Sequence, residues 1–328
     1  MPAGRYVTSV HLLALSLSLC SPLVALAEAS PAHDQLQAMA EANRSLNYTG
    51  RFLYQFGAEI STMEVSHALI EGRQYQRLTH LDGRLVEVIR RGDEVLCLHP
   101  DRSLTRLSSK QMGPLALGDR LASDLPEQYN ILIDGDGRVA GRTTTRMRVA
   151  PLDTHRYGYR LWLDQESRLL LKSEVVDGSG VALERVEFVT LNLSPQLGLD
   201  HFAVPEARHE KALAPVPDSH PSLTLTVTPE WLPAGFRAME QDWRQATTDR
   251  APVAARGFSD GLAAFTVFVE AIGENSVEEG VSRVGPTVAV SRRLAAPSGV
   301  YLVTLVGEVP QSTALRVIEG ISVRENQP

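Results

Sequence analysis

Alternation of apolar and polar residues with a period of two is the feature that most limits what this chain can fold into. Apolar side chains alternate with polar ones over 46–56, and the pattern returns over 62–69. Successive side chains of a β-strand point to opposite faces, so the pattern predicts strands with one buried face. Further strand-like runs are Gln74–Leu81, Leu85–Arg91, Glu94–Leu98, Tyr129–Ile133, Arg138–Val149, Arg156–Leu163, Arg168–Val176 and Val181–Leu193.

Turn residues separate many of these runs and predict antiparallel hairpins. They are Asp82-Gly83, Gly92-Asp93, Asp134–Gly137 and Asp177–Gly180, and short loops of this composition join neighbouring strands. Two helices are also expected, over 33–45 and 114–125, because apolar residues there follow helical spacing. The sequence therefore predicts a mostly β domain over 28–204, a meander of about ten strands with helices packed on it.

A change of composition divides the chain. Four prolines interrupt the polar segment 205–221, which we expect to be a semi-rigid linker. Residues 222–328 then show strand patterns at Leu223–Thr228, Leu262–Glu270, Thr287–Leu294 and Val300–Glu308, with a helix expected after Pro310. This part is predicted to be a smaller α+β domain.

Residues 1–27 have the features of a cleaved signal peptide. Arg5 is their only charged residue, an apolar stretch covers 10–19, and Ala25–Ala27 forms an A-x-A cleavage site. The stretch is shorter than the roughly 20 apolar residues that cross a bilayer. Cys20 raises the alternative of a lipoprotein signal, although large Leu19 stands where a small residue is favoured. We expect cleavage after Ala27 and a soluble periplasmic protein.

No motif predicts catalysis. Gly257–Gly261 matches the G-x-S-x-G nucleophile elbow, which requires a following helix and a downstream histidine. The next residues read as a strand, and the last histidine is His220. Ser259 is therefore predicted to lie in a hairpin turn, and the protein is predicted not to be an enzyme.

Metal and cofactor sites are not expected either. His67, His80, His99 and His155 stand singly on different strands, without the paired spacing of metal ligands. Asp134–Gly137 lacks the later oxygen ligands of a calcium loop and predicts a tight turn. Cys97 lies in an apolar strand and is expected to be an inert buried thiol.

The net charge of the chain limits the kinds of partner that it can bind. The formal net charge is −7, which argues against a protein that neutralises nucleic-acid phosphates.

A curled sheet has a concave face that must be filled or must hold a ligand. An aromatic and aliphatic stripe could line such a cavity: Phe52, Tyr54, Phe56, Tyr157, Tyr159 and Leu161. The alternative is an ordinary core packed by the two helices, and the alternation pattern leaves both open.

Several segments of the chain resemble the MucB/RseB family. The resemblance rests on Leu46–Tyr54, His67, Arg77–Gly83, Glu87–Arg90, Leu232–Phe236, Phe258–Leu262, Gly307–Pro310 and Thr313-Ala314. They occur in the family's order and span nearly all of the chain after residue 27.

The resemblance implies a fold and a function. The large domain would be an unclosed antiparallel β-barrel plugged by helices, similar to the LolA/LolB lipoprotein carriers. The protein would bind the periplasmic part of a transmembrane anti-sigma factor of the MucA/RseA type and shield it from the first regulatory protease. Lipopolysaccharide or another lipid would release it. The resemblance brings no catalytic residues and no cofactor.

A partner's amphipathic helix is expected to bind in a cleft between the two domains. Candidate anchors in or beside loop-like sequence are Trp231, Phe236 and Phe258, and Arg292 and Arg293 are candidates for acidic groups of the partner or of lipid phosphates. The alternatives are core packing for Trp231 and a solvated strand edge for the arginines.

Two other functions compete. A lipid or lipoprotein carrier fits the large domain alone, but it does not require the second domain. A secreted hydrolase is disfavoured by the missing histidine. The sequence leaves the formation of a homodimer open.

Overall fold

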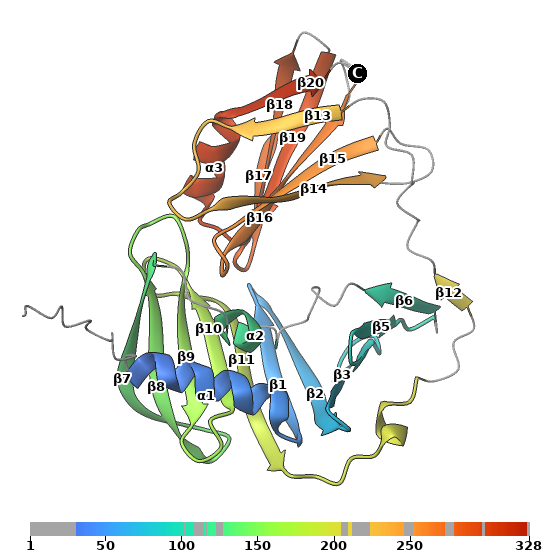
Figure 1. Cartoon of the computed structure of the whole chain (residues 1–328), viewed down its shortest axis with the longest axis vertical. Helices are drawn as coiled ribbons and strands as arrows, with labels where there is room; N and C mark the ends of the chain where they lie inside the picture. The colour runs from blue at the N-terminus through green and yellow to red at the C-terminus, as the bar shows by residue number, and fades with distance from the viewer. Residues whose placement is uncertain are drawn as a thin grey trace, which may run out of the picture.

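The computed structural model describes residues 31–101, 103–107, 115, 117–122, 127–204, 209–211, 224–245, 252–272, 279–296 and 299–326. The predicted signal peptide lies outside these residues. Two bodies built on β-sheets are evident (Figure 1), one before and one after the proline-rich segment.

The larger body contains one 12-stranded sheet with the order β12-β6-β5-β4-β3-β2-β1-β11-β10-β9-β8-β7. Its elements are α1 (Pro31–Ser45), β1 (Tyr48–Phe56), β2 (Glu59–Ile70), β3 (Arg73–His80), β4 (Glu87–Arg91), β5 (Glu94–Leu98), β6 (Ser103–Leu107), α2 (Leu117–Ala122), β7 (Tyr129–Val139), β8 (Arg142–Pro151), β9 (Gly158–Asp164), β10 (Leu170–Val176), β11 (Ala182–Leu193), η1 (Leu199–Phe202) and β12 (His209–Lys211). All pairs are antiparallel except that of β12 with β6. The sheet has two free ends, β12 and β7, so the predicted unclosed, mostly β architecture is confirmed.

Helices α1 and α2 cover the half of this sheet that contains β7 to β10. In Figure 1, α1 lies across these strands. Leu36 and Met39 of α1 and Leu121 of α2 are buried in one apolar cluster with residues of the sheet such as Met147 and Leu161. The amphipathic pattern predicted for 33–45 therefore produces the expected packing of a helix on the sheet.

One predicted turn is wrong. Asp134–Gly137 does not end a strand, because β7 continues to Val139 and the chain reverses at Ala140-Gly141, both with positive φ. The register between β7 and β8 shifts between Ile133 and Asp136, which marks a β-bulge. Gly135, with φ of 83°, supplies the backbone conformation that the bulge requires.

The proline-rich segment is not wholly without structure. His209–Lys211 forms β12 and pairs in parallel with β6, whereas most of the segment lies outside the described residues.

The smaller body has a six-stranded sheet, β14-β15-β16-β19-β18-β17, and a two-stranded sheet, β13-β20. Its elements are β13 (Thr224–Pro229), β14 (Arg237–Gln245), β15 (Pro252–Ser259), β16 (Ala264–Ala271), β17 (Gly280–Val284), β18 (Thr287–Ala296), β19 (Gly299–Gly307), α3 (Gln311–Glu319) and β20 (Ile321–Asn326). The predicted helix is α3, whose Ala314, Val317 and Ile318 are buried in this body's own core.

Candidate functional site

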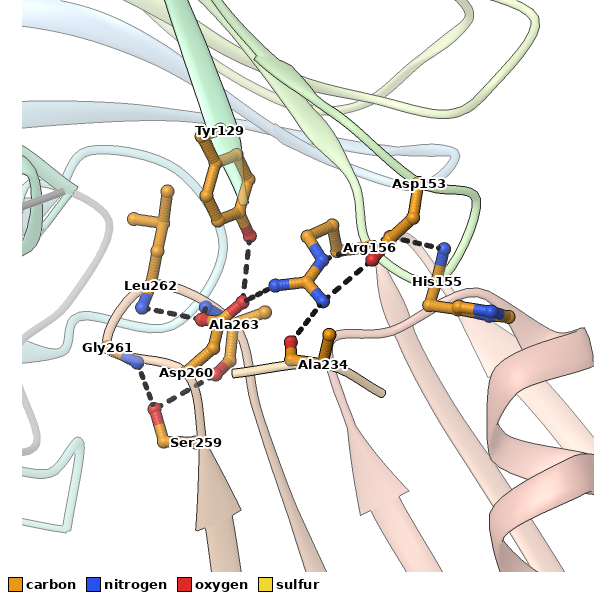
Figure 2. A network of polar contacts seen from close by, with 10 residues as sticks. All are labelled: Tyr129, Asp153, His155, Arg156, Ala234, Ser259, Asp260, Gly261, Leu262 and Ala263. Atoms are coloured by element: carbon orange, nitrogen blue, oxygen red, sulfur yellow. Dashed lines mark hydrogen bonds and ion pairs between the residues drawn. The ribbon is translucent and has the colours of Figure 1, made fainter. Parts of the chain in front are cut away.

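A buried ion pair connects the two bodies. Arg156, in the segment before β9, contacts the carboxylate of Asp260 in the β15–β16 turn, and neither side chain has exposed surface. Arg156 also donates to the Asp153 carboxylate at 2.9 Å and to the carbonyl of Ala234 at 2.7 Å. Tyr129 donates its hydroxyl to Asp260 at 3.4 Å. Figure 2 shows this set, which we call the Arg156 network.

The sequence of the β15–β16 turn places Asp260 for this contact. Its Oδ1 accepts the amides of Leu262 and Ala263 at 2.9 and 2.7 Å, which fixes the carboxylate by local hydrogen bonds. Gly261 has a φ of 105°. Ser259 donates its hydroxyl to the carbonyl of Ala263 at 2.9 Å. The predicted hairpin turn is therefore confirmed, and Ser259 is one of its structural elements.

Donors surround the carboxylates of the Arg156 network. Burial opposes the ionisation of Asp153, but hydrogen bonds from the Arg156 side chain and the His155 amide hold its pKa below the usual value. Removing the arginine would leave the buried carboxylate of Asp260 without its cation, a change that destabilises proteins strongly.

Apolar and aromatic residues make further contacts between the two bodies. Leu262 of the smaller body is 2% exposed and belongs to the core cluster of the larger one. Tyr157 donates its hydroxyl to the carbonyl of Val309 at 3.0 Å. The two bodies are thus in direct contact through buried apolar and polar side chains.

Trp231 lies at the edge of this junction. The His155 ring of the larger body meets it edge-on, with 5.0 Å between ring centroids, and Arg316 of α3 lies 3.8 Å above it. His155 also contacts the Thr313 hydroxyl at 3.3 Å. Trp231 is half-buried, so part of its ring remains accessible.

A second charged contact between the bodies involves Glu308, which follows β19 and accepts a hydrogen bond from Arg120 of α2 at 3.4 Å. Glu184 of β11 and Tyr54 of β1 interact electrostatically with each other and with Glu308. Burial raises the pKa of Glu184 to about 7, and the charge of Glu308 adds to this effect, while Tyr54 and Arg120 oppose it. We call Glu184 and Glu308 the carboxyl pair.

A cavity lies against the middle of the large sheet, between helices α1 and α2 and strands β1 to β5, β10 and β11. Its volume is about 60 Å³, room for one or two waters, whereas pockets for organic ligands occupy roughly 300–1,000 Å³. The lining is mixed: Tyr48, Leu78, Val88, Val95, Leu115, Leu117, Leu170, Val186 and Phe188 are apolar or aromatic, and Asn43, His67, Gln74, Gln76, Arg90, Lys172 and Ser173 are polar.

None of the residues predicted to line a cavity is among those that line this one. Phe52, Tyr157, Tyr159 and Leu161 are at most 3% exposed and belong to core clusters, and Tyr54 and Phe56 are half-buried near the junction. Alternation identified the inner face correctly, but it does not indicate where helices fill that face. The aromatic residues that line the cavity are Tyr48 of β1 and Phe188 of β11.

The residues predicted to bind a partner lie in different environments of the structure. Phe258 is in β15, not in a loop, and both it and Phe236 stack on Phe265 inside the smaller core, where they are 1% and 7% exposed. Their burial does not support a role as partner anchors in this arrangement. Arg292 donates to the carbonyl of Glu319 at the end of α3.

The arginine next to it has a different environment. Arg293 is exposed, and its backbone amide donates to Glu279. Two of the five candidates contact the larger body: Trp231 meets the His155 ring, and Phe236 lies under the guanidinium of Arg156, 5.4 Å from its ring centroid.

Other sequence-based predictions concern chemistry. In the described residues, no three histidine, cysteine, aspartate or glutamate side chains are grouped so as to hold a metal ion. Burial raises the pKa of Cys97, which agrees with an inert thiol. Among the helices that the structure describes, none has the length and apolar character needed to cross a membrane.

The chain belongs to the MucB/RseB family. A family model described as the MucB/RseB N-terminal domain matches residues 31–211, and one described as the MucB/RseB C-terminal domain matches residues 223–322. Both bodies are therefore accounted for by one family of regulatory proteins, which agrees with the prediction that the chain is not an enzyme.

Relatives share nearly the full length. The sigma factor AlgU regulatory protein MucB of Pseudomonas aeruginosa is 35% identical over 90% of this chain and 92% of the relative. The sigma-E factor regulatory protein RseB of Escherichia coli K12 is 30% identical over 90% of this chain and 92% of its own length.

Solved structures extend the likeness to three dimensions. A crystal structure of MucB in complex with MucA(peri) has a TM-score of 0.71 at 32% identity, covering 89% of this chain and 98% of that one. The Pseudomonas aeruginosa MucA/MucB complex also scores 0.71, at 32% identity over 90% of this chain and 99% of that one. A crystal structure described as MucB, with no partner named, scores 0.60 at 31% identity over 90% and 98%.

Proposed function

We propose that this protein is a periplasmic negative regulator of an envelope-stress sigma factor. It binds the periplasmic part of a transmembrane anti-sigma factor of the MucA/RseA type. While bound, it shields that partner from site-1 proteolysis, and lipopolysaccharide or another lipid releases it. A cleaved signal peptide at residues 1–27 would bring it to the periplasm.

One observation carries the proposal: the likeness to the MucA-bound structures includes both bodies. The coverage is 89% of this chain, at 32% identity, in the complex with MucA(peri). The TM-score is also higher to the two complexes than to the structure with no partner named, 0.71 against 0.60. The docked arrangement of this chain therefore resembles the partner-bound form, and we infer that docking creates the binding surface.

The junction offers a place for such a partner. Trp231 is half-buried at its edge, flanked by His155 and Arg316. An aromatic side chain that is held on two sides loses little rotamer freedom on binding, which is favourable for an interface anchor. A bound segment that contacts both bodies would stabilise docking, and a lipid that favours separated bodies would weaken partner binding by the same free energy.

The test combines binding with protection. Calorimetry should show that the chain from residue 28 binds a purified MucA-type periplasmic segment, and that lipopolysaccharide weakens the affinity at least tenfold, about 1.4 kcal/mol. The bound segment should resist the site-1 protease, and added lipopolysaccharide should restore cleavage. Arg51→Ala, on an exposed ion pair of the large sheet, serves as a matched control. Absence of binding, or cleavage unaffected by binding, would refute the proposal.

The alternative is a periplasmic carrier of lipids or lipoproteins. The mixed polar and apolar cavity beside β3 to β5 favours it, but its volume of about 60 Å³ requires side chains to move before an acyl chain can enter. A pull-down from membranes discriminates the two functions. Capture of a range of lipoproteins would support carriage, and capture of one inner-membrane protein would support regulation.

A further inference from the structure

Basic side chains gather on the outer face of the large sheet, over strands β8 to β11. The inward residues of these strands, such as Met147, Leu161 and Val175, belong to the core cluster that α1 and α2 cover. Successive residues of a strand point to opposite faces, so their neighbours lie on the face away from the helices. Two rows of directly paired residues, which we call the basic rows, cross that face. The first contains Arg148, Arg160, Glu174 and Arg185, and the second contains Arg146, Trp162, Lys172 and Glu187.

Glu174 holds three of the cations in place. Its side chain is 4% exposed and forms ion pairs with Arg160 at 3.2 Å, Lys172 at 3.4 Å and Arg185 at 3.0 Å. Lys172 also pairs with Glu187 at 3.0 Å, and its ammonium lies 4.6 Å from the centroid of the Trp162 ring. One buried carboxylate thus orders several cations without neutralising all of them.

The basic rows carry an excess of positive charge. Five cations stand against two carboxylates in these rows, on a chain whose formal net charge is −7. Arg160 and Arg185 keep 40% and 38% of their side-chain surfaces exposed. Arg146 and Arg148 are exposed, and Arg148 forms no ion pair with a described residue. The excess charge therefore faces solvent.

Acidic residues near the basic rows lie at the margins of this face. Asp164 and Glu166, at the end of β9 and in the turn after it, both accept from Arg142. Asp136 belongs to β7, the edge strand, and accepts from Gln165 at 2.9 Å. Asp177, in the turn after β10, accepts from Ser179. The middle of the face is left to the cations.

The same face has further features of a surface that lies on a membrane. Adjacent strands are about 4.8 Å apart, so four strands spread the cations over roughly 15 Å. Exposed leucines flank the rows, since Leu132 pairs with Arg148 and Leu53 pairs with Glu187. Tryptophan and exposed apolar side chains beside lysine and arginine are typical of protein surfaces at the membrane interface. An extended array of this kind matches an extended anionic surface better than it matches one small anion.

We propose that the basic rows bind the surface of an anionic phospholipid bilayer and hold the outer face of the larger body against it. This inference rests on the proposed function for its setting, because a regulator of a transmembrane protein acts beside a bilayer. Binding to the bilayer would raise the local concentration of the regulator near the partner's periplasmic segment. It uses lipid headgroups and the outer face, and it requires no lipid to enter the cavity.

Vesicle binding tests the proposal in the absence of a partner. The chain from residue 28 should sediment with vesicles of phosphatidylglycerol and phosphatidylethanolamine in equal amounts, and not with vesicles of phosphatidylcholine alone. Raising the ionic strength from about 0.01 M to 0.15 M shortens the Debye length from roughly 30 to 8 Å and should release most of the chain. No binding to the anionic vesicles, or equal binding to both kinds, would overturn the proposal.

A charge reversal locates the binding surface. Arg148 stands opposite Arg160, so Arg148→Glu places a carboxylate beside a cation and should keep the fold, which circular dichroism checks. Each basic side chain near an anionic surface strengthens binding about fivefold, so this change of two charges should weaken vesicle binding at least tenfold. Arg148→Gln should give an intermediate loss. Arg73→Glu, exposed on β3, is the matched control with the same change in net charge and should weaken binding less than about twofold. Equal weakening by Arg73→Glu and Arg148→Glu would contradict the assignment to the basic rows.

Two further measurements separate this inference from its alternatives. Inorganic phosphate at matched ionic strength should not displace the chain from vesicles, and displacement would indicate a site for a single phosphate group instead. Arg148→Glu should bind a MucA-type periplasmic segment in solution as tightly as the unmodified chain does. Weaker binding there would mean that the basic rows contact the partner and not the bilayer. Vesicle binding by a chain that binds no such segment would refute the proposed function and leave this inference standing.

Discussion

Two groups of charged side chains at the junction of the bodies differ in how their carboxylates are compensated. In the Arg156 network, Asp153 and Asp260 each accept several hydrogen bonds, and the pKa of Asp153 is lowered. In the carboxyl pair, Glu184 has a raised pKa because burial and a neighbouring charge outweigh its donor. The comparison predicts that the stabilisation from the Arg156 network persists across neutral pH, while the stabilisation linked to the proton of Glu184 is lost there.

Removing the cation of the first contact should have the largest effect. Arg156→Ala leaves Asp153 and Asp260 without their buried partner, and the free energy of unfolding should fall by about 3–5 kcal/mol. Urea denaturation of the full chain measures this value. A loss below about 1 kcal/mol, the range of exposed pairs, would show that the network does not fix docking.

Loss of an apolar contact at the junction should have the second largest effect on stability. Leu262→Ala removes a side chain that is 2% exposed in the core of the opposite body, and should reduce the free energy of unfolding by about 2–4 kcal/mol. Leu85→Ala is the control, because Leu85 is 57% exposed. Equal effects of the two substitutions in urea denaturation would mean that the burial of Leu262 against the opposite body does not stabilise the molecule.

The next largest effect on stability is expected where the turns at Gly57 and Gly285 approach each other. Gly285 has a φ of 56°, and an added Cβ would lie 3.1 Å from the amide nitrogen of Gly57. Gly285→Ala should therefore reduce the free energy of unfolding by about 1–3 kcal/mol. Gly72→Ala carries a similar strain at φ of 75° with open space around it. The difference between the two variants isolates the contact between the bodies, and no difference would contradict it.

The second polar contact predicts a smaller, pH-dependent effect. The pKa of Glu184 is about 7 in the folded chain against an ordinary value of 4.5, so the stabilisation linked to its proton is fully present below 4.5 and is lost as the pH rises through 7. From pH 6 to pH 8, the free energy of unfolding should fall by about 1.4 kcal/mol. Thermal denaturation at matched ionic strength should show this loss in the unmodified chain and in Arg156→Lys, but not in Glu184→Gln.

An exposed ion pair provides the smallest effect. Arg51 and Glu64 are paired across β1 and β2 with 61% and 44% of their side-chain surfaces exposed. Arg51→Ala should change the free energy of unfolding by less than about 1 kcal/mol in urea denaturation. A larger loss would mean that ion pairs outside the junction matter as much as those within it.

The sequence predicted strands well where one face is buried. The runs around β1, β2 and β8 to β11 alternate because one side of each packs on a core. Strands β14, β15 and β17 were missed, since charged residues, Pro252 or full exposure remove the pattern. The turn at Asp134–Gly137 was misplaced because glycine and aspartate serve a β-bulge as well as a turn.

The junction could not be predicted from the sequence. Arg156 and Asp260 are 104 positions apart, and a single arginine and a single aspartate carry no spacing signal. Asp260 lay within a motif that could be rejected as catalytic, but its contact with the other body depends on the fold. Trp231 was predicted as an anchor from its place near a loop, and its position at the junction keeps that prediction open to test.

The central claim is that the docked arrangement is the one that binds the partner. Calorimetric titration of a MucA-type periplasmic segment into the unmodified chain and into Arg156→Ala tests it most directly, with circular dichroism to confirm that both remain folded and Arg51→Ala as control. We predict that Arg156→Ala binds at least tenfold more weakly, about 1.4 kcal/mol, while Arg51→Ala matches the unmodified chain. An affinity of the folded Arg156→Ala chain equal to that of the unmodified chain would contradict the claim.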